Sequence, residues 1–402
     1  MNRRHFLHMS LGAALWAALP RRARADARAK AAILLYMEGG PSQIDTFDPK
    51  PGRPTGGEFK AIATAVAGIQ ISEHLPGLAA RMKHLAIVRS LTANEGNHER
   101  ARRLMHTGYA PQAGVDHPAL GSIVAEKRAP DDLPGYVAVS GPGEAAGFLS
   151  AELSPFFVQS AGKPVRYLEP AGVGEARFAR RIELWRSFED DFLRSHASRY
   201  AEAQRTVGEK AIAMMHSPRV AAFKLDDEPA ATRQAYGDGE FGLGCLMARR
   251  LVEAGVPFVE VTHKGWDTHK DNFPTVKRLS EELDRGMGAL LDDLAARGLL
   301  DQTLVAWMGD FGRTPTINGN GGRDHYPGCQ SVVLAGGGIR GGQVVGATDA
   351  DGVAVKDRPV AVPDLFRTLA TQLGLDPDER RVAPSGRPIK TVDGGTVIAE
   401  LV

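Results

Sequence analysis

The 402-residue chain has almost no net charge and very little cysteine. Its 49 lysine and arginine residues and 48 aspartate and glutamate residues leave a net charge of +1, which gives no basic surface for nucleic acid and no acidic tail. The only cysteines, Cys245 and Cys329, lie in no CxxC pair, which argues against a cysteine zinc site; the sequence leaves their pairing open. No apolar run is long enough for a stable membrane span.

The sequence also lacks the short signatures of two common enzyme classes. Without GxSxG there is no support for a nucleophile elbow, and without GK[ST] there is no phosphate loop. Residues 336–341 read GxGxxG, but an extended segment follows where a dinucleotide site needs a helix. Ser42, after Gly-Gly-Pro, is the only serine in a suggestive context, and a turn residue is its stronger interpretation.

Residues 1–27 have the layout of a cleaved twin-arginine signal peptide. Arg3 and Arg4 precede a short apolar run at 9–19, and small residues follow it. This order predicts export of the folded protein through the twin-arginine translocation machinery, to the periplasm or out of the cell. An uncleaved tether and a chance basic start are the alternatives. Residues 28–402 are expected to form one domain.

Apolar runs alternate with helical patterns along the rest of the chain. Buried strands are predicted at 31–37, 85–91, 136–140, 258–261, 304–308 and 331–335. Helices are predicted at 75–82, 97–108, 181–215, 241–255, 272–297 and 363–373. Strands that are apolar along their whole length and separated by helices predict an α/β fold, with a large, mostly parallel sheet sandwiched by helices.

Carboxylates and histidines gather where these strands end. Asp45 follows the first strand, Asp267 and His269 follow the strand at 258–261, and Asp310 follows the strand at 304–308, while His325 precedes the strand at 331–335. Sites in open α/β sheets form beyond the carboxyl ends of the strands, so the last four residues are expected to converge. Oxygen and imidazole ligands indicate a divalent metal site.

Each of these residues also has a plainer interpretation. Asp267 could cap the helix that follows it and His269 could be solvent exposed, and Asp310 and Asp45 are suited to turns. Asp324 could orient His325 without binding metal itself. A turn alone, however, does not explain four such clusters, and the metal site remains the stronger hypothesis.

Five segments in order, GGPSQIDTFDPKP, NHERARRLMHTG, GWDTHKDN, GDFGRTP and GRDHYP, carry a family resemblance over nearly the whole mature chain. Together they resemble an exported bacterial family, domain of unknown function 1501, which is sulfatase-like and belongs to the alkaline phosphatase-like superfamily. The resemblance implies an alkaline phosphatase-like fold and a metal-dependent ester hydrolase site. It also implies a divalent ion, either zinc, manganese or calcium, and a small anionic ester or glycan as substrate.

The chain departs from sulfatases at two places. Residues 38–39 stand where sulfatases have paired aspartates, with Asp45 as a substitute further on. His98 stands at the position of the covalent nucleophile, and Arg102 matches the arginine that follows it. This alignment implies that His98 is a base or a metal ligand, and that Arg102 or Arg313, with Asn97, binds the anionic group.

Two function classes therefore stay open. The first is a metal-dependent hydrolase of phosphate or sulfate esters that lacks the usual covalent nucleophile. The alternative is a non-catalytic metal- or glycan-binding protein on a degenerate sulfatase-like scaffold, and a weaker third option is a partner subunit of another exported protein. Fold alone does not decide among them.

Overall fold

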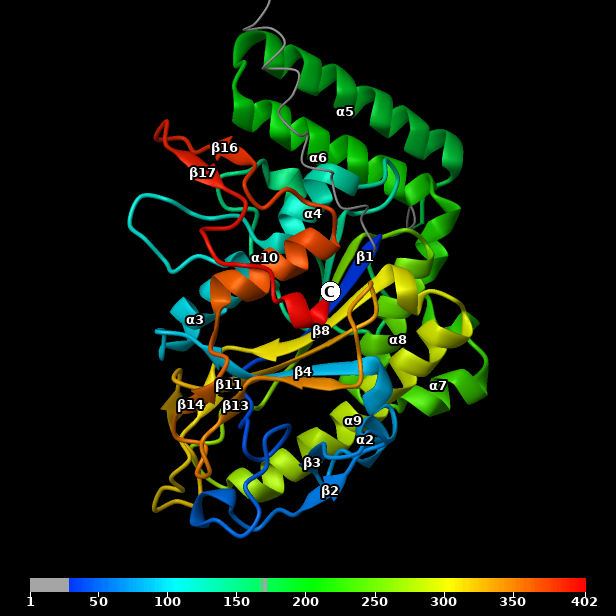
Figure 1. The fold of residues 1–402 in the computed structure, drawn as a ribbon. Coiled ribbons are helices and arrows are strands. Elements are labelled where there is room, and N and C mark those ends of the chain that lie inside the picture. The colour runs from blue at the N-terminus through cyan, green and yellow to red at the C-terminus, as the bar shows by residue number, and fades with distance from the viewer. Residues whose placement is uncertain (1–28, 167, 169–171) are drawn as a thin grey trace, which may run out of the picture.

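The computed structural model describes residues 29–402 apart from 167 and 169–171, so the predicted signal peptide lies outside the described residues. A nine-stranded sheet runs through the molecule with helices on both faces (Figure 1). Its strands follow the order β12-β4-β11-β8-β1-β7-β5-β6, with β15 beside β4. They comprise β1 (Ala31–Met37), β4 (Leu85–Thr92), β5 (Tyr136–Val139), β6 (Phe156–Val158), β7 (Phe258–His263), β8 (Thr303–Gly309), β11 (Gln330–Ala335), β12 (Gln343–Val345) and β15 (Val360–Ala361).

One strand runs against the others. β11 pairs antiparallel with both β4 and β8, whereas the other pairings in this sheet are parallel. The expected large, mostly parallel α/β sheet is therefore confirmed. Because β11 is reversed, its first residue lies at the edge where β1, β7 and β8 end. The loop that enters β11 thus meets the loops that leave those three strands.

The two faces of the sheet carry separate cores. Along β1, Ile33 and Leu35 face one core while Leu34 and Tyr36 face the other, as expected for a strand whose side chains alternate. The first core is covered by α2 (Pro76–Ala80), α8 (Glu240–Glu253) and α9 (Asn272–Ala296), and the second by α3 (His98–Thr107), α4 (Leu120–Arg128) and α10 (Val362–Gln372). Burial on both faces explains why the central strands are apolar throughout.

The long helical pattern at 181–215 divides into two helices. α5 (Glu175–Ser195) and α6 (Arg199–His216) are joined by three residues, and the Ser198 side chain caps α6 by accepting a hydrogen bond from the Ala201 amide. Figure 1 shows this pair at the outer end of the molecule. α5 has no buried residue, so it contributes little to the cores.

The remaining elements are short. Besides short 3₁₀ helices, they are α7 (Ala230–Tyr236) and four two-stranded pairings: β2 (Ala61–Ala63) with β3 (Gln70–Ser72), β9 (Gly312–Arg313) with β10 (His325–Tyr326), β13 (Ala347–Thr348) with β14 (Val355–Asp357), and β16 (Arg380–Val382) with β17 (Pro388–Lys390). The glycine-rich 336–341 segment leads into β12 and not into a helix. Cys245 and Cys329 are both free and buried. Within the described residues, no helix has the length and apolar character needed to cross a membrane.

Candidate metal centre

His98 is the first residue of α3, at the edge of the sheet where β1, β7 and β8 end. The Asn97 side chain caps the helix by accepting a hydrogen bond from the Arg100 amide at 3.3 Å. Gly108 ends the helix in the left-handed conformation with φ 75°. Asn97 therefore has a structural partner where a substrate-binding role was expected, and its capping sets where His98 begins the helix.

Three histidines and one carboxylate meet at a single point. Asp267 Oδ1 lies 3.2 Å from His269 Nε2, 3.4 Å from His325 Nε2 and 3.5 Å from His98 Nε2. The Nε2 atoms of His269 and His325 are 2.9 Å apart. Ligand atoms bound at 2.0–2.2 Å to one tetrahedral ion are about 3.3–3.6 Å from each other. His98, Asp267 and His325 thus have ligand atoms close enough to share one ion, and His269 Nε2 lies beside the atoms of Asp267 and His325.

The other ring nitrogen of each histidine, Nδ1, is held by a neighbouring group, and this explains why the Nε2 atoms converge. Each Nδ1 faces a hydrogen-bond acceptor: His98 faces Asp310 Oδ2 at 2.6 Å, His269 faces Asp324 Oδ1 at 2.8 Å, and His325 faces the Gly96 carbonyl at 2.8 Å. An acceptor at Nδ1 favours a proton there, which leaves the Nε2 lone pair free to bind a metal. Asp324 therefore orients His269 and not, as expected, His325.

The residues present fit a divalent cation. His98 Nε2 is buried and has no hydrogen-bond partner within the described chain, and a buried unpaired polar atom is unusual enough to need an explanation. His98, Asp267 and His325 each offer a ligand atom, all within 4.8 Å of one another. An ion among these atoms would satisfy His98 Nε2 and use the free lone pairs of the other rings.

Asp310 lies behind His98. Besides His98 Nδ1, its carboxylate accepts hydrogen bonds from the Tyr36 hydroxyl and, at 3.1 Å, from the Gly39 amide. Asp310, expected as a metal ligand, thus contacts His98 and supports its ring from behind. The glycine before it is required by packing, because a Cβ on Gly309 would lie 2.4 Å from Pro41 Cδ.

Asp45 belongs to a different network, which corrects the expectation that it binds the metal. Its carboxylate is fully buried and accepts hydrogen bonds from Arg323 Nε at 2.8 Å and Nη2 at 2.9 Å. The Asn272 amide donates a third at 2.8 Å. This ion pair ties the turn after β1 to the loop before β11, so Asp45 is structural.

Arg313, expected to bind substrate, is also fully buried. Its guanidinium donates to the carbonyls of Gly39, Gly40 and Arg323 and, at 2.5 Å, to Asp267 Oδ1. Burial would raise the pKa of Asp267, but Arg313 outweighs it and holds that pKa below its usual value. Asp267 is therefore an anion fixed by Arg313. It does not cap α9, since the N-cap residue of that helix is Asp271.

An open cleft of about 630 Å³ lies against the candidate metal centre. It is lined by Glu38, Gly39, His98, Glu99, Arg102, Lys264, Gly265, Asp267 and Asp310, none of which is a serine, threonine or cysteine. At one side Arg102 Nη1 contacts the Gly143 carbonyl at 3.1 Å and Glu144 at 2.8 Å. Ser42 is buried in the turn after β1, where its Oγ accepts a hydrogen bond from the Asp45 amide at 3.2 Å.

The pKa values of His98 and His325 are shifted in opposite directions. The hydrogen bond to Asp310 raises the pKa of His98, whereas burial lowers the pKa of His325. The hydrogen bond from His269 lowers the pKa of Asp324. A metal binds the neutral imidazole, so protons would compete with a metal more strongly at His98 than at His325.

Sequence patterns gave no signal for two supporting groups. Tyr36 lies inside a continuous apolar strand and reads as a core residue. The Gly96 carbonyl is a backbone group, and any residue at that position would offer it. Both support the centre only because of the tertiary fold.

The chain belongs to the family described as "Protein of unknown function (DUF1501)", whose model matches residues 29–402. No curated protein matches the sequence. Among solved structures, the chain is similar to the PsFucS1 sulfatase from Pseudoalteromonas sp. (14% identity, 87% of this chain and 68% of that chain, TM-score 0.41). It is also similar to the lipoteichoic acid synthase LtaP from Listeria monocytogenes (11% identity, 94% and 77%, TM-score 0.43). A third is the alkaline phosphatase from the Antarctic bacterium TAB5 (13% identity, 79% and 94%, TM-score 0.34).

Proposed function

We propose that this member of the DUF1501 family is an exported, metal-dependent hydrolase of phosphate or sulfate esters that works without a covalent enzyme intermediate. The observation that carries the proposal is the convergence of three imidazole Nε2 atoms on Asp267 Oδ1 beside an open cleft. No hydroxyl or thiol side chain lines that cleft among the described residues.

The ligands would be His98, Asp267, His269 and His325. Three imidazoles and one carboxylate suit zinc better than calcium, which prefers an all-oxygen shell. A divalent ion held there supplies Lewis-acid polarisation of an ester oxygen and makes water a stronger nucleophile. The protein fixes the ligands in advance through the Nδ1 partners of the histidines and through Arg313.

Arg102 and Lys264 are the cationic side chains of the cleft. Glu144 and the Gly143 carbonyl hold the Arg102 guanidinium at the wall of the cleft, where it would bind a phosphate or sulfate group. Water attacks the phosphorus or sulfur atom, and the ester bond to the leaving oxygen breaks. Glu38 lines the same cleft with an exposed carboxylate, and we assign it as the acceptor of the proton that the water loses.

The test is a screen of the mature chain, 28–402, loaded with zinc or manganese, against aryl phosphate, phosphodiester and aryl sulfate. We expect turnover of at least one ester class, lost in Asp267→Asn. Under single-turnover conditions no phospho- or sulfo-enzyme should be detected by mass spectrometry. A covalent adduct, on Ser42 for example, would contradict the mechanism. A fully loaded protein that turns over no ester would support the non-catalytic binding protein instead.

Export through the twin-arginine route is part of the same proposal. It is motivated by Arg3 and Arg4 ahead of the short apolar run. Replacing both with lysine should leave the protein in the cytoplasm as the uncleaved precursor. Unchanged delivery to the periplasm would show that a different signal directs export.

A further inference from the structure

A buried polar group lies between α3 and the sheet, behind the metal centre. Glu260 in the middle of β7 is 1% exposed, and its carboxylate faces His106 Nε2 at 3.1 Å and accepts a hydrogen bond from the Tyr136 hydroxyl at 2.5 Å. His106 Nδ1 lies 2.7 Å from the Arg102 carbonyl. Burying such a pair is costly, and a hydrophobic replacement often serves stability as well. Stability alone therefore does not explain the pair, and we looked for a functional role.

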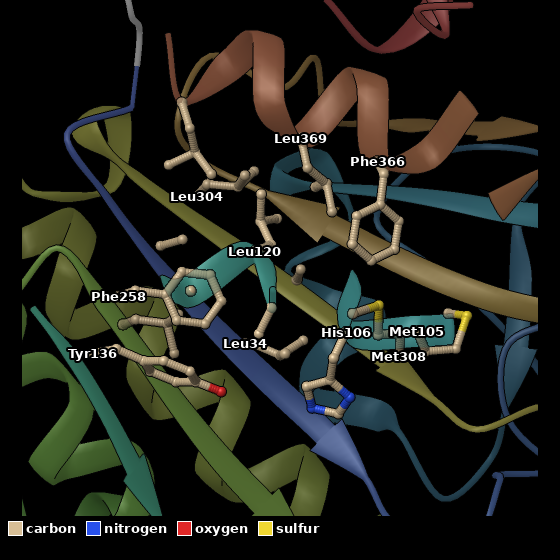
Figure 2. A pocket seen from close by; sticks show the side chains of 16 residues that line it. Leu34, Met105, His106, Leu120, Tyr136, Phe258, Leu304, Met308, Phe366 and Leu369 are labelled. Atoms are coloured by element: carbon tan, nitrogen blue, oxygen red, sulfur yellow. The ribbon is translucent and has the colours of Figure 1, made fainter. Parts of the chain in front are cut away.

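The cavity beside this pair does not provide that role. Figure 2 shows the His106 ring and the Tyr136 hydroxyl at one end of a cavity whose other labelled side chains are apolar, among them Leu34, Leu120 and Phe258. Its volume is about 20 Å³, enough for about one water molecule. Both ring nitrogens of His106 already have partners, so the cavity is no ligand site.

Tyr36 connects the buried pair to the metal centre. Its ring packs on the ring of His106, with centroids 4.4 Å apart, and its hydroxyl donates to Asp310 Oδ1. The other carboxylate oxygen of Asp310 faces His98 Nδ1 at 2.6 Å. Contacts thus run without a gap from Glu260 through His106, Tyr36 and Asp310 to His98.

We propose that Tyr36 is a positioning residue of the metal centre: the His106–Glu260 pair fixes its ring, and its hydroxyl fixes Asp310 and thereby His98. This inference rests on the proposed function, because both require that the centre binds a metal. Among the described residues, the Gly39 amide, at 3.1 Å, is the one further donor to Asp310 besides Tyr36 and His98. Without the Tyr36 hydroxyl, Asp310 Oδ1 would lose its donor and the carboxylate would be held through Oδ2 alone, so the orientation of His98 would be less firmly fixed.

The experiment compares Tyr36→Phe with Tyr236→Phe. Tyr236 is also buried, and its hydroxyl donates to Asp293 at 3.0 Å, but it lies on α7 against α9. Each variant removes one hydrogen bond from a buried tyrosine to an aspartate, so a merely structural role predicts the same result for both. The readouts are zinc affinity, measured by competition with a chelating dye, and the imidazole Nδ1–H signal of His98 in metal-free protein by NMR.

We expect Tyr36→Phe to bind zinc about 10- to 100-fold more weakly than wild type, as is typical when a partner of a metal ligand is removed. Its His98 Nδ1–H signal should shift and exchange faster with water, while Tyr236→Phe should match wild type in both readouts. Glu260→Gln should weaken zinc binding in the same direction. Wild-type affinity and an unchanged His98 signal in Tyr36→Phe would overturn the inference. A wild type that binds zinc but hydrolyses no ester would refute the proposed function and leave this result standing.

Discussion

Replacing Asp45 with asparagine tests whether this residue is structural or a metal ligand. The substitution keeps the side-chain volume and removes the charge that faces Arg323. Both side chains are fully buried, and they share hydrogen bonds of 2.8 and 2.9 Å. Removing one partner of a buried ion pair destabilises a protein by about 3–5 kcal/mol, because the other charge is left without compensation.

The loss of unfolding free energy expected for Asp45→Asn lies near the lower limit of that range. The asparagine amide oxygen can still accept one hydrogen bond from Arg323, whose guanidinium also keeps its bonds to the carbonyls of Thr314, Pro315 and Thr55. We therefore expect Asp45→Asn to lower the free energy of unfolding by about 3 kcal/mol. The zinc content of the folded protein should stay at the wild-type level.

Urea unfolding and metal analysis of the same sample measure both quantities. Asp351→Asn is the matched control, because Asp351 forms the same two-bond pair with Arg53, at 2.6 and 2.7 Å, on the surface. An exposed pair contributes little, so this control should unfold like wild type. A fall in zinc content with unchanged stability in Asp45→Asn would refute the reasoning and restore Asp45 as a ligand.

Three further predictions concern the centre and its surroundings. His98→Ala and His98→Ser should both lose zinc on dialysis against a chelator that leaves the wild type loaded; retention in both would show that His98 is not a ligand. Arg102→Gln should lower kcat/KM about 10- to 100-fold, chiefly through KM, because one charge-assisted contact to the anion is lost; an unchanged KM would exclude Arg102 from substrate binding. Burial lowers the pKa of His106, but Glu260 outweighs it and leaves that pKa above the ordinary 6.5, while the pKa of Glu260 stays below 4.5. The stability that the charged pair contributes should therefore fade as pH rises through the raised His106 value and as pH falls through the lowered Glu260 value, and the difference in unfolding free energy between wild type and Glu260→Gln should follow this course.

Local patterns predicted the sheet and much of the centre. Apolar runs ending in glycine and carboxylates placed Asp267 and Asp310 at strand exits, and those exits lie at one edge because the strands are parallel. The alternation of Asp267 and His269 put both side chains on one side of their loop, and the structure brings them within 3.2 Å. These features depend on residues that are close together in the sequence, so local patterns can predict them.

Roles that depend on distant partners were not predictable in this way. Asp45 and Arg323 are 278 residues apart, and nothing local to either indicates a buried ion pair. Arg313 reads as an anion-binding arginine until the fold surrounds it with carbonyls. The reversed direction of β11, which brings His325 to the centre, is likewise set by sheet packing.

The most direct test of the central claim is a crystal structure of the zinc-loaded protein with anomalous diffraction at the zinc edge. We expect one strong peak within about 2.0–2.2 Å of Asp267 Oδ1 and of the Nε2 atoms of His98, His269 and His325, with Asp310 on the far side of His98. A peak bound instead by Asp45, or a loaded protein with no peak among the three histidines, would contradict it.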